Sequence, residues 1–423
     1  MSGTIAWRTM AVATMLAMLG VSALARPPKP APSPDPRPRA LTRHEFNYKD
    51  WTVSPIVRLH SYQFRTDPNE VPASTSPTVL DAVAMIYPLI AGSAMHDVYL
   101  DRVTSEFSLG NKKLDLRPRT LPNYQGGTML AVWEAKDIHS TEALQLRVDI
   151  PMTCYETRID EDIALTYDWP TGEYKPMIAS CLEPQLYVEP GHPAIQKLVQ
   201  EWTKGNVKNA KPYLAAKYLA GKVVEHFQPT EGDYESAGRG PERGKVTAVL
   251  LEGFNVHGAA YAAERRRGSR FDMACLLTAV YRGAGIPARM VIGLDLEKTR
   301  ESNIPVLRAW TEFYLYDEAA EAGEWIPVDI VKQREFSSRM PPLKQRWQFF
   351  GHNEEFDQMA PLAYHWLPPT ANTNTGPPGV WGWIPSPGVP AVDAELQFVY
   401  NETSRRGDDP KEWWERPKQQ PMQ

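Results

Sequence analysis

The residues with the most distinctive chemistry lie in one apolar segment, residues 268–289. It brings a hydroxyl, a guanidinium, a carboxylate and a thiol within seven positions: Ser269, Arg270, Asp272 and Cys275. The thiol lies well inside the apolar stretch, where a cysteine most simply acts as a small hydrophobic side chain. The arginine suits either an ion pair with a carboxylate or the bidentate binding of an anion.

The pattern of apolar residues predicts the elements that hold these groups. Apolar residues within 271–281 recur at spacings of three and four, which predicts a helix with one broad buried face. Gly283 and Gly285 stop this helix, and Pro287 cannot extend it. Residues 290–294 are apolar and β-branched, so we predict that a core strand follows the turn.

Two further strands are predicted downstream, at 308–316 and 325–331. The first begins Arg-Ala-Trp-Thr-Glu, and the second begins Trp-Ile-Pro-Val-Asp. A helix followed by an antiparallel sheet predicts an α+β layer.

These motifs together resemble the core of the transglutaminase-like superfamily, whose fold is papain-like. The pattern Gly-x-x-x-Asp-x-Ala, then Arg-x-x-Gly-Ile-Pro-Ala-Arg, is similar to the first family motif. The strand that begins Arg308-Ala-Trp310 resembles the family's His-Ala-Trp strand, and the strand ending in Asp329 resembles its Trp-x-x-x-Asp strand. The resemblance is dense over 268–329. It is weaker over 83–188, which resembles the β-rich domain that often precedes this core.

The resemblance also implies which residues stand at the catalytic positions of the family. The nucleophilic cysteine falls on Arg270 and the base histidine on Arg308, whereas Asp329 is the residue that the family uses. A guanidinium stays charged and offers no lone pair, so neither arginine can replace a thiolate or an imidazole. We therefore expect a degenerate, catalytically inactive triad that forms an Arg-Arg-Asp cluster.

Several interpretations of this cluster are open. It is either a structural ion-pair group, or a pocket for a carboxylate, sulfate or phosphate group; a misregistered alignment is the remaining alternative. Asp329 is the expected counter-ion, with Asp272 and Glu312 as further candidates. The candidate binding residues are Arg270, Arg308, Asp329, Trp310 and Asp272.

The resemblance and its altered positions suggest a protein without catalytic activity that binds a protein or cell-envelope peptide, by analogy of fold alone. Its expected export is inferred separately, from the pattern of the N-terminus. The alternative is an active thiol peptidase or acyl transferase of the same superfamily with a non-standard nucleophile. Cys275 or Ser269 would then have to act, although no histidine stands at the base position to activate the serine. A purely structural envelope protein is a third hypothesis.

Composition and charge exclude other classes of function. The 423-residue chain has 42% hydrophobic and 23% charged residues, which is ordinary for a globular protein. Its net charge of −5 argues against a nucleic-acid partner. Neither a phosphate-binding glycine loop nor a Cys/His metal spacing occurs in the sequence, so no cofactor or metal is predicted. The oligomeric state is not predicted.

The N-terminus has the pattern of an export signal. Arg8 precedes an apolar run at 10–24 that is too short to span a membrane comfortably. The Ala-Leu-Ala at 23–25 fits a signal-peptidase site, so we expect a mature chain that begins at Arg26 and has no integral membrane segment. Its predicted location is periplasmic or extracellular. An uncleaved anchor is the alternative.

The chain divides into five predicted regions. A signal peptide (1–25) and a proline-rich spacer (26–40) precede a β-rich domain (41–190). The transglutaminase-like core (191–345) follows, and then a C-terminal extension (346–423) with one strand and a polar tail. Strands of an antiparallel, sandwich-like domain are predicted at 83–90, 96–109, 127–133 and 144–151. Helices are predicted at 195–202 and 213–227, and a last strand at 394–400.

Cysteine usage leaves two possibilities in the β-rich domain. Cys154 and Cys181 lie 27 residues apart (181 − 154) in runs that both read as strands. A disulfide between them is plausible in an exported protein. Two separate buried thiols are the alternative.

Overall fold

The computed structural model describes ten stretches of the chain. They are residues 39–60, 80–124, 127–138, 143–233, 248–250, 254–302, 305–318, 320–367, 379–386 and 393–406. The predicted signal peptide and nearly all of the spacer lie outside these residues. None of the helices within them has the length and apolar character that a membrane span requires.

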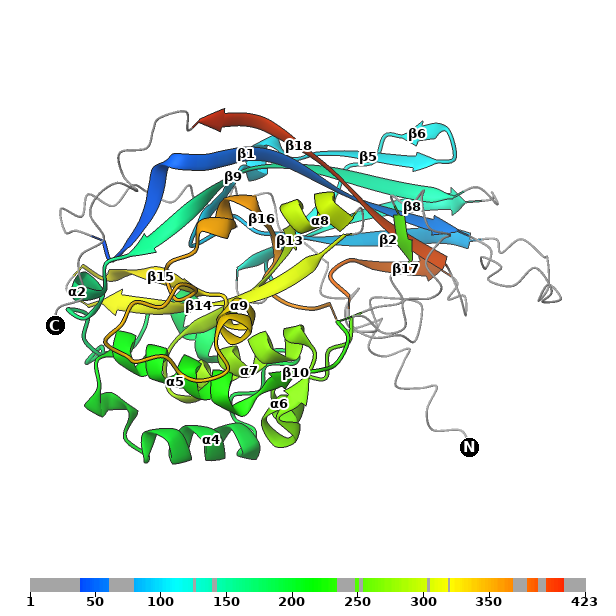
Figure 1. The fold of residues 1–423 in the computed structure, drawn as a ribbon. Helices are drawn as coiled ribbons and strands as arrows, with labels where there is room; N and C mark the ends of the chain where they lie inside the picture. Colours follow the sequence, from blue (N-terminus) through cyan, green and yellow to red (C-terminus); the bar gives the residue numbers. More distant parts are fainter. Residues whose placement is uncertain are drawn as a thin grey trace, which may run out of the picture. The chain divides into compact units, whose positions relative to one another are not determined.

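The largest sheet has eight strands and includes both early and late parts of the chain (Figure 1). Its main path runs β11-β18-β1-β9-β4-β3, with β5 paired to β9 and β6 to β5. The strands are β1 (Leu41–His60), β3 (Gly92–Ser93), β4 (His96–Val98), β5 (Thr104–Leu109), β6 (Lys112–Leu114), β9 (Leu144–Ile159), β11 (Ala248–Leu250) and β18 (Asp393–Arg406). Strand β18, the strand predicted near the C-terminus, pairs antiparallel with β1. The C-terminal part of the chain therefore completes the N-terminal sheet.

A second, four-stranded sheet runs β17-β2-β8-β7. Its strands are β2 (Leu80–Leu89), β7 (Arg119–Tyr124), β8 (Thr128–Ile138) and β17 (Gly382–Ser386). The hydroxyl of Tyr87 links the two sheets, since it donates to the carbonyl of Leu146 at 2.8 Å and accepts from the amide of Val57 at 3.0 Å. Strands therefore dominate the N-terminal part, as predicted.

The third sheet runs β15-β14-β13-β16 and is packed against helices. Its strands are β13 (Ala288–Asp295), β14 (Leu307–Asp317), β15 (Ala322–Val328) and β16 (Met359–Ala363), and the main helices are α4 (Pro193–Thr203), α5 (Pro212–His226), α6 (Ala259–Arg265) and α7 (Arg270–Gly283). Helix α7 contacts β13 and β14 as well as α4, α5 and α6 (Figure 1). All its residues from Phe271 to Arg282 are buried. Burial thus extends beyond the one broad face that the spacing of apolar residues predicts, because strands and helices both pack against α7. The predicted α+β class is confirmed.

The strand predicted at 325–331 is too long at its C-terminal end. Strand β15 stops at Val328, Asp329 caps the next helix, and α9 (Ile330–Phe336) begins immediately. Residues 325–331 form a short apolar run that contains one aspartate. Such a run shows neither a clear strand period nor a clear helix period, so the sequence does not reveal where the strand ends and the helix begins.

The predicted disulfide is wrong. All three cysteines of the chain are free and buried. Cys154 lies on β9 opposite His96, whereas Cys181 lies in a 3-10 helix, η2 (Ser180–Leu182), and not in a neighbouring strand. Strand β9 ends at Ile159, and the described residues around Cys181 form no strand beside it.

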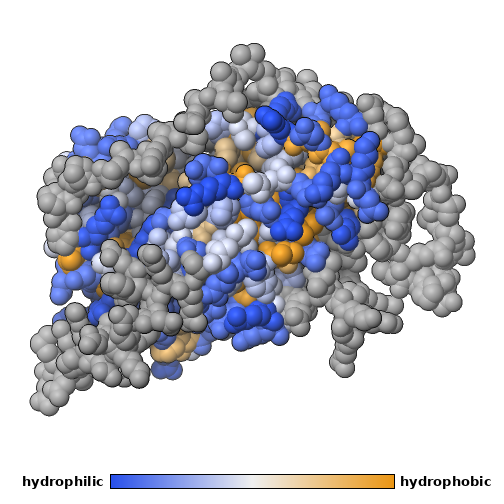
Figure 2. Space-filling model, turned by 90° about the horizontal axis from the view of Figure 1, so that it is seen from above, coloured by the Kyte–Doolittle hydropathy of each residue, from blue (hydrophilic) through white to orange (hydrophobic). Residues whose placement is uncertain are grey.

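The surface has few large exposed apolar side chains. Hydrophilic residues cover much of the described surface in Figure 2, with apolar residues interspersed. Among the described residues, the large hydrophobic side chains that are exposed are Leu165, Met177, Phe336 and Val399.

His96 makes folding sensitive to acid. The ring is buried, its Nε2–H donates to the carbonyl of Phe356 at 3.1 Å, and its Nδ1 accepts from the hydroxyl of Ser93. Burial lowers the pKa of His96 to about 3. Below about pH 6.5 His96 binds a proton in the unfolded chain but not in the folded chain. The free energy of unfolding should therefore fall by up to ~1.4 kcal/mol for each pH unit of acidification between about pH 6.5 and pH 3.

Urea unfolding at pH 7 and pH 5 measures this loss. We expect His96→Gln to lose less stability than the natural protein between these two pH values. His365, whose pKa burial lowers to about 4, contributes the same sign in both proteins and cancels in the comparison. Equal losses in the two proteins would contradict the prediction.

Candidate functional site

The first turn of α7 is fixed by a capping box. Ser269 is the N-cap and its hydroxyl accepts from the amide of Asp272, while Asp272 Oδ2 accepts from the amide of Ser269 at 3.0 Å. Asp272 Oδ1 accepts from the amides of His257 and Gly258 at 2.7 and 2.8 Å. A Cβ at Gly268 would lie 2.5 Å from Asp272 Oδ2, which explains the glycine before the cap.

The prediction of Asp272 as a binding residue or counter-ion of the arginines therefore needs correction. Its carboxylate is fully buried, and both oxygens accept hydrogen bonds from the backbone. Asp272 positions the start of α7 and a neighbouring loop.

Replacing Asp272 by alanine should destabilise the fold by roughly 2 kcal/mol or more, because the amides of Gly258 and Ser269 lose a buried acceptor at about 1–3 kcal/mol each. The part-buried hydrogen bond from the amide of His257 is lost as well. Asp272→Asn should cost less, since one oxygen can still accept from His257 and Gly258. Urea unfolding of both variants measures the difference. An alanine variant as stable as the natural protein would show that these hydrogen bonds contribute little.

Arg270 is the first residue of α7 and is paired with carboxylates. Its Nε donates to Asp233 Oδ2 at 2.7 Å, its amide donates to Asp233 Oδ1 at 3.2 Å, and its Nη1 lies 3.8 Å from Glu335. The hydrogen bond to Asp233 raises the pKa of Arg270. Asp233 thus offsets the cost of placing a cation at the positive end of a helix.

Arg308 lies on β14 and its side chain is only 6% exposed. Its Nη2 donates to Asp329 Oδ2 at 2.9 Å, and its Nη1 donates to Asp295 Oδ2 at 3.3 Å. Burial alone would lower the pKa of Arg308, but the charges of Asp329 and Asp295 outweigh it and the pKa is raised. The predicted pairing of Arg308 with Asp329 is confirmed.

Asp329 performs a second task, as the N-cap of α9. Its Oδ1 accepts from the amide of Lys332 at 3.0 Å. The ammonium of Lys332 lies 2.9 Å from Glu355, which is 3.8 Å from Arg308. Asp233 raises the pKa of Arg270, and the positive charge of Arg308 opposes this rise, so the two arginines belong to one charge network.

We call this network the charge cluster. Its members are Arg270, Arg308, Lys332, Asp233, Asp295, Asp329, Glu335 and Glu355. Three cations face five carboxylates, a formal excess of two negative charges. Sequence reasoning missed Asp233, Asp295, Glu335 and Glu355, because they come from separate segments that no motif marks.

Two other predicted residues serve the core. Trp310 is fully buried, with its ring 5.7 Å from His96 and 5.6 Å from Phe356, so its face is not free to stack on a ligand. Glu312, a suggested counter-ion of the cluster, pairs instead with Arg289, whose Nη2 lies 2.7 Å from Glu312 Oε2.

Cys275 is enclosed in the middle of α7. It is fully buried and its Sγ lies 3.7 Å from the sulfur of Met290. Burial raises the pKa of its thiol well above the ordinary value. A thiol that is both protonated and inaccessible is a poor nucleophile.

Within the described ranges, no group of three or more histidine, cysteine, aspartate or glutamate side chains is arranged to hold a metal ion. The ion pairs of the charge cluster join guanidinium or ammonium groups to carboxylates.

Comparison with known proteins gives the class of the core. Residues 200–330 match the family model of the transglutaminase-like superfamily. This match includes α7, β13, β14 and Asp329, so the helix-and-sheet core is transglutaminase-like. No curated protein sequence matches the chain.

The solved structures that are similar to the chain include two candidate proteases. One is a crystal structure of a candidate cysteine protease from Cytophaga hutchinsonii, with 14% identity and a TM-score of 0.48, covering 86% of this chain and 94% of that one. The other is a candidate protease from Parabacteroides distasonis, with 10% identity and a TM-score of 0.22, covering 57% of this chain and 43% of that one.

Proposed function

We propose that this chain is an exported transglutaminase-like protein that performs no thiol catalysis and binds a protein or cell-envelope peptide at its charge cluster. The observation that carries the proposal is the pair formed by Arg308 and Asp329, 2.9 Å apart. A catalytic imidazole would have to stand where this guanidinium is. We assign the position of the nucleophile to Arg270, the first residue of α7.

The chemistry of the family needs a thiolate, a base and a carboxylate that orients the base. In the proposed assignment only the carboxylate, Asp329, is kept, and its partner Arg308 has no lone pair to accept a proton. The alternative of an active thiol enzyme requires Cys275, and the burial of that side chain argues against it.

The charges of the cluster favour one kind of ligand over another. Every cation in it already has a carboxylate within 4 Å, and Glu335 and Glu355 are 44% and 43% exposed. A carboxylate, sulfate or phosphate group would meet an excess of negative charge. A neutral or basic peptide fits this balance better than the anion that two arginines alone would attract.

Peptide titration tests the binding half of the proposal. Two fluorescein-labelled peptides of equal length are used, one alternating lysine with alanine and the other glutamate with alanine. We expect the lysine peptide to bind more tightly, and more weakly in high salt. The double variant Glu335→Gln with Glu355→Gln should weaken the binding of the lysine peptide roughly two- to tenfold. Glu201→Gln, on α4, is the control and should leave this affinity unchanged. Tighter binding of the glutamate peptide would favour an anion pocket.

Restoring the missing residues tests the catalytic half. The variant Arg270→Cys with Arg308→His is assayed beside the natural protein for peptide cleavage and for amine transfer. We expect no turnover by either protein, since Asp233 and Glu335 would raise the pKa of a thiol at position 270. Turnover by the natural protein would refute the proposal, whereas turnover by the variant alone would show that the surrounding residues still support catalysis.

Export is proposed from the N-terminal pattern alone. Cell fractionation followed by N-terminal sequencing should find a chain that begins at Arg26. An intact N-terminus in the membrane fraction would favour the uncleaved anchor, and an intact chain in the cytoplasm would refute export.

A further inference from the structure

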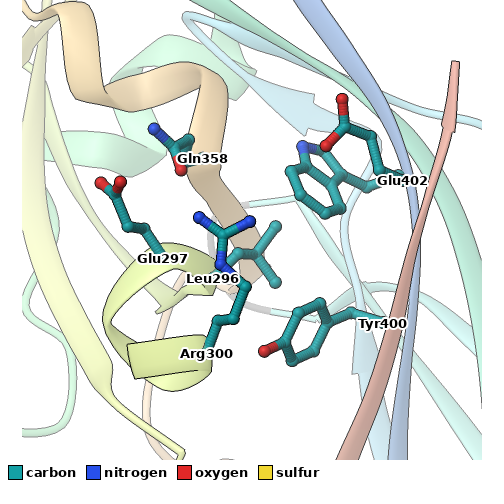
Figure 3. Close-up of a pocket in the computed structure, with 7 residues that line it drawn as sticks. Leu296, Glu297, Arg300, Gln358, Tyr400 and Glu402 are labelled. Atoms are coloured by element: carbon teal, nitrogen blue, oxygen red, sulfur yellow. The ribbon is translucent and has the colours of Figure 1, made fainter. Parts of the chain in front are cut away.

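A pocket away from the charge cluster combines two aromatic rings with four polar side chains (Figure 3). Its volume is about 170 Å³. It is lined by Trp51 of β1, Tyr400 and Glu402 of β18, Gln358 of the 3-10 helix η4 (Glu354–Gln358), and Leu296, Glu297 and Arg300 of α8 (Leu296–Ser302). Four elements that are distant in sequence therefore meet around one small space.

The aromatic wall is rigid. The indole Nε1 of Trp51 donates to the carbonyl of Asp357 at 2.9 Å, which fixes the ring on η4. The ring of Tyr400 meets it edge to face, with centroids 6.3 Å apart and an interplanar angle of 63°. Two rings held at this angle form an apolar corner, and a corner that is already ordered loses little entropy when a ligand enters.

Four polar side chains surround this corner, and those of Arg300 and Glu402 are exposed. Among the described residues, the side chains of Glu297, Arg300, Gln358 and Glu402 make no hydrogen bond or ion pair. In Figure 3 the guanidinium of Arg300 lies centrally, between Glu297 and Gln358 on one side and Tyr400 on the other. Donors and acceptors thus converge on the space without satisfying one another.

The mixture of charges narrows the class of ligand. Two carboxylates beside one guanidinium disfavour a simple anion, and the guanidinium of Arg300 weakens the attraction that the carboxylates would have for a simple cation. A hydroxyl group both donates and accepts, so a neutral polyhydroxylated ligand can donate to Glu297 and Glu402 while it accepts from Arg300 and Gln358. The C–H face of such a ligand would cover an aromatic ring.

We propose that this pocket binds one pyranose unit of a neutral saccharide, with Trp51 and Tyr400 as the stacking surface and the four polar side chains as hydrogen-bond partners. The volume suits a single small ring and not a long chain. This site does not depend on the function proposed for the charge cluster.

The binding experiment uses the mature chain and a panel of sugars. Saturation-transfer NMR and calorimetric titration are run with maltose, cellobiose and N,N′-diacetylchitobiose as neutral probes. Galacturonate and glucosamine are the charged comparisons. We expect saturable binding of at least one neutral disaccharide and weaker binding of both charged sugars.

Single variants locate the binding. Glu297→Ala, Arg300→Ala and Glu402→Ala change side chains at the rim of the pocket, and each should weaken the neutral sugar about tenfold, as expected for the loss of a hydrogen bond to a charged group. Asn401→Ala is the matched control, because strand alternation points Asn401 away from the pocket that its neighbours Tyr400 and Glu402 line. Its affinity should equal that of the natural protein.

Three outcomes would overturn the proposal. They are the absence of neutral-sugar binding, tighter binding of galacturonate or glucosamine, and neutral-sugar binding that the three rim variants leave unchanged. Thermal unfolding of each variant shows whether a loss of binding reflects a loss of the fold.

Discussion

Replacing Arg308 by alanine should reduce the free energy of unfolding by about 3–5 kcal/mol, the usual cost of leaving a buried charge without its partner. The change would strand Asp329 and Asp295, whose side chains are 4% and 6% exposed. It would also weaken the start of α9, since Asp329 is oriented by Arg308 and caps that helix. Urea unfolding, with equal slopes for both proteins, measures the loss.

Arg270→Ala is the matched comparison within the charge cluster. The side chain of Arg270 is 41% exposed, and solvent screens much of its interaction with Asp233 and Glu335. We expect a loss of about 1 kcal/mol or less, as for exposed ion pairs. If Arg308→Ala and Arg270→Ala lose equal free energy of unfolding, burial does not explain why Arg308 is expected to contribute more than Arg270 to the stability of the charge cluster.

Replacing Arg289 by alanine should cost at least as much: about 3–5 kcal/mol for the buried ion pair and roughly 1–4 kcal/mol more for two cation–π contacts. Its guanidinium pairs with Glu312, whose side chain is fully buried, through contacts of 2.7 and 2.8 Å. It also lies 4.2 Å from the ring of Trp325 and 4.4 Å from that of Tyr364, and each cation–π contact adds about 0.5–2 kcal/mol. The variant removes both contributions and leaves an uncompensated carboxylate.

The exposed pair of Lys113 and Glu106 provides the control for Arg289. These side chains are 73% and 47% exposed at 2.7 Å, so Lys113→Ala should change stability by less than about 1 kcal/mol. Arg289→Lys should recover part of the loss, because an ammonium keeps the charge but not the planar stacking. If Arg289→Ala is as stable as Lys113→Ala, the carboxylate of Glu312 does not need its partner for stability, and the prediction is contradicted.

The core elements could be predicted because their signals are local. Apolar residues recur at three and four positions in α7 and alternate in β18, and β13 is an apolar, β-branched run. The predicted bounds of α7, β13 and β14 fall within two residues of the structure, whereas β18 continues six residues past its predicted end. The end of β15 could not be predicted in the same way, because Asp329 interrupts an apolar run without a turn signal.

The site was predictable only in part. The resemblance pointed to Arg270, Arg308 and Asp329, and the structure pairs the last two. The spacing Ser269-x-x-Asp272 is itself a capping-box signature, which could have assigned Asp272 to the helix start. The carboxylates that neutralise the arginines had no such signal, because only the tertiary fold brings them together.

Thiol labelling tests most directly the claim that no nucleophile serves this site. The folded protein is treated with iodoacetamide, the modified cysteines are identified by mass spectrometry, and peptide cleavage and amine transfer are assayed in the same samples. The account predicts that Cys275 reacts only after denaturation and that no turnover is detected at any stage. Rapid alkylation of Cys275 in the folded protein, with turnover that disappears as the label is incorporated, would contradict it.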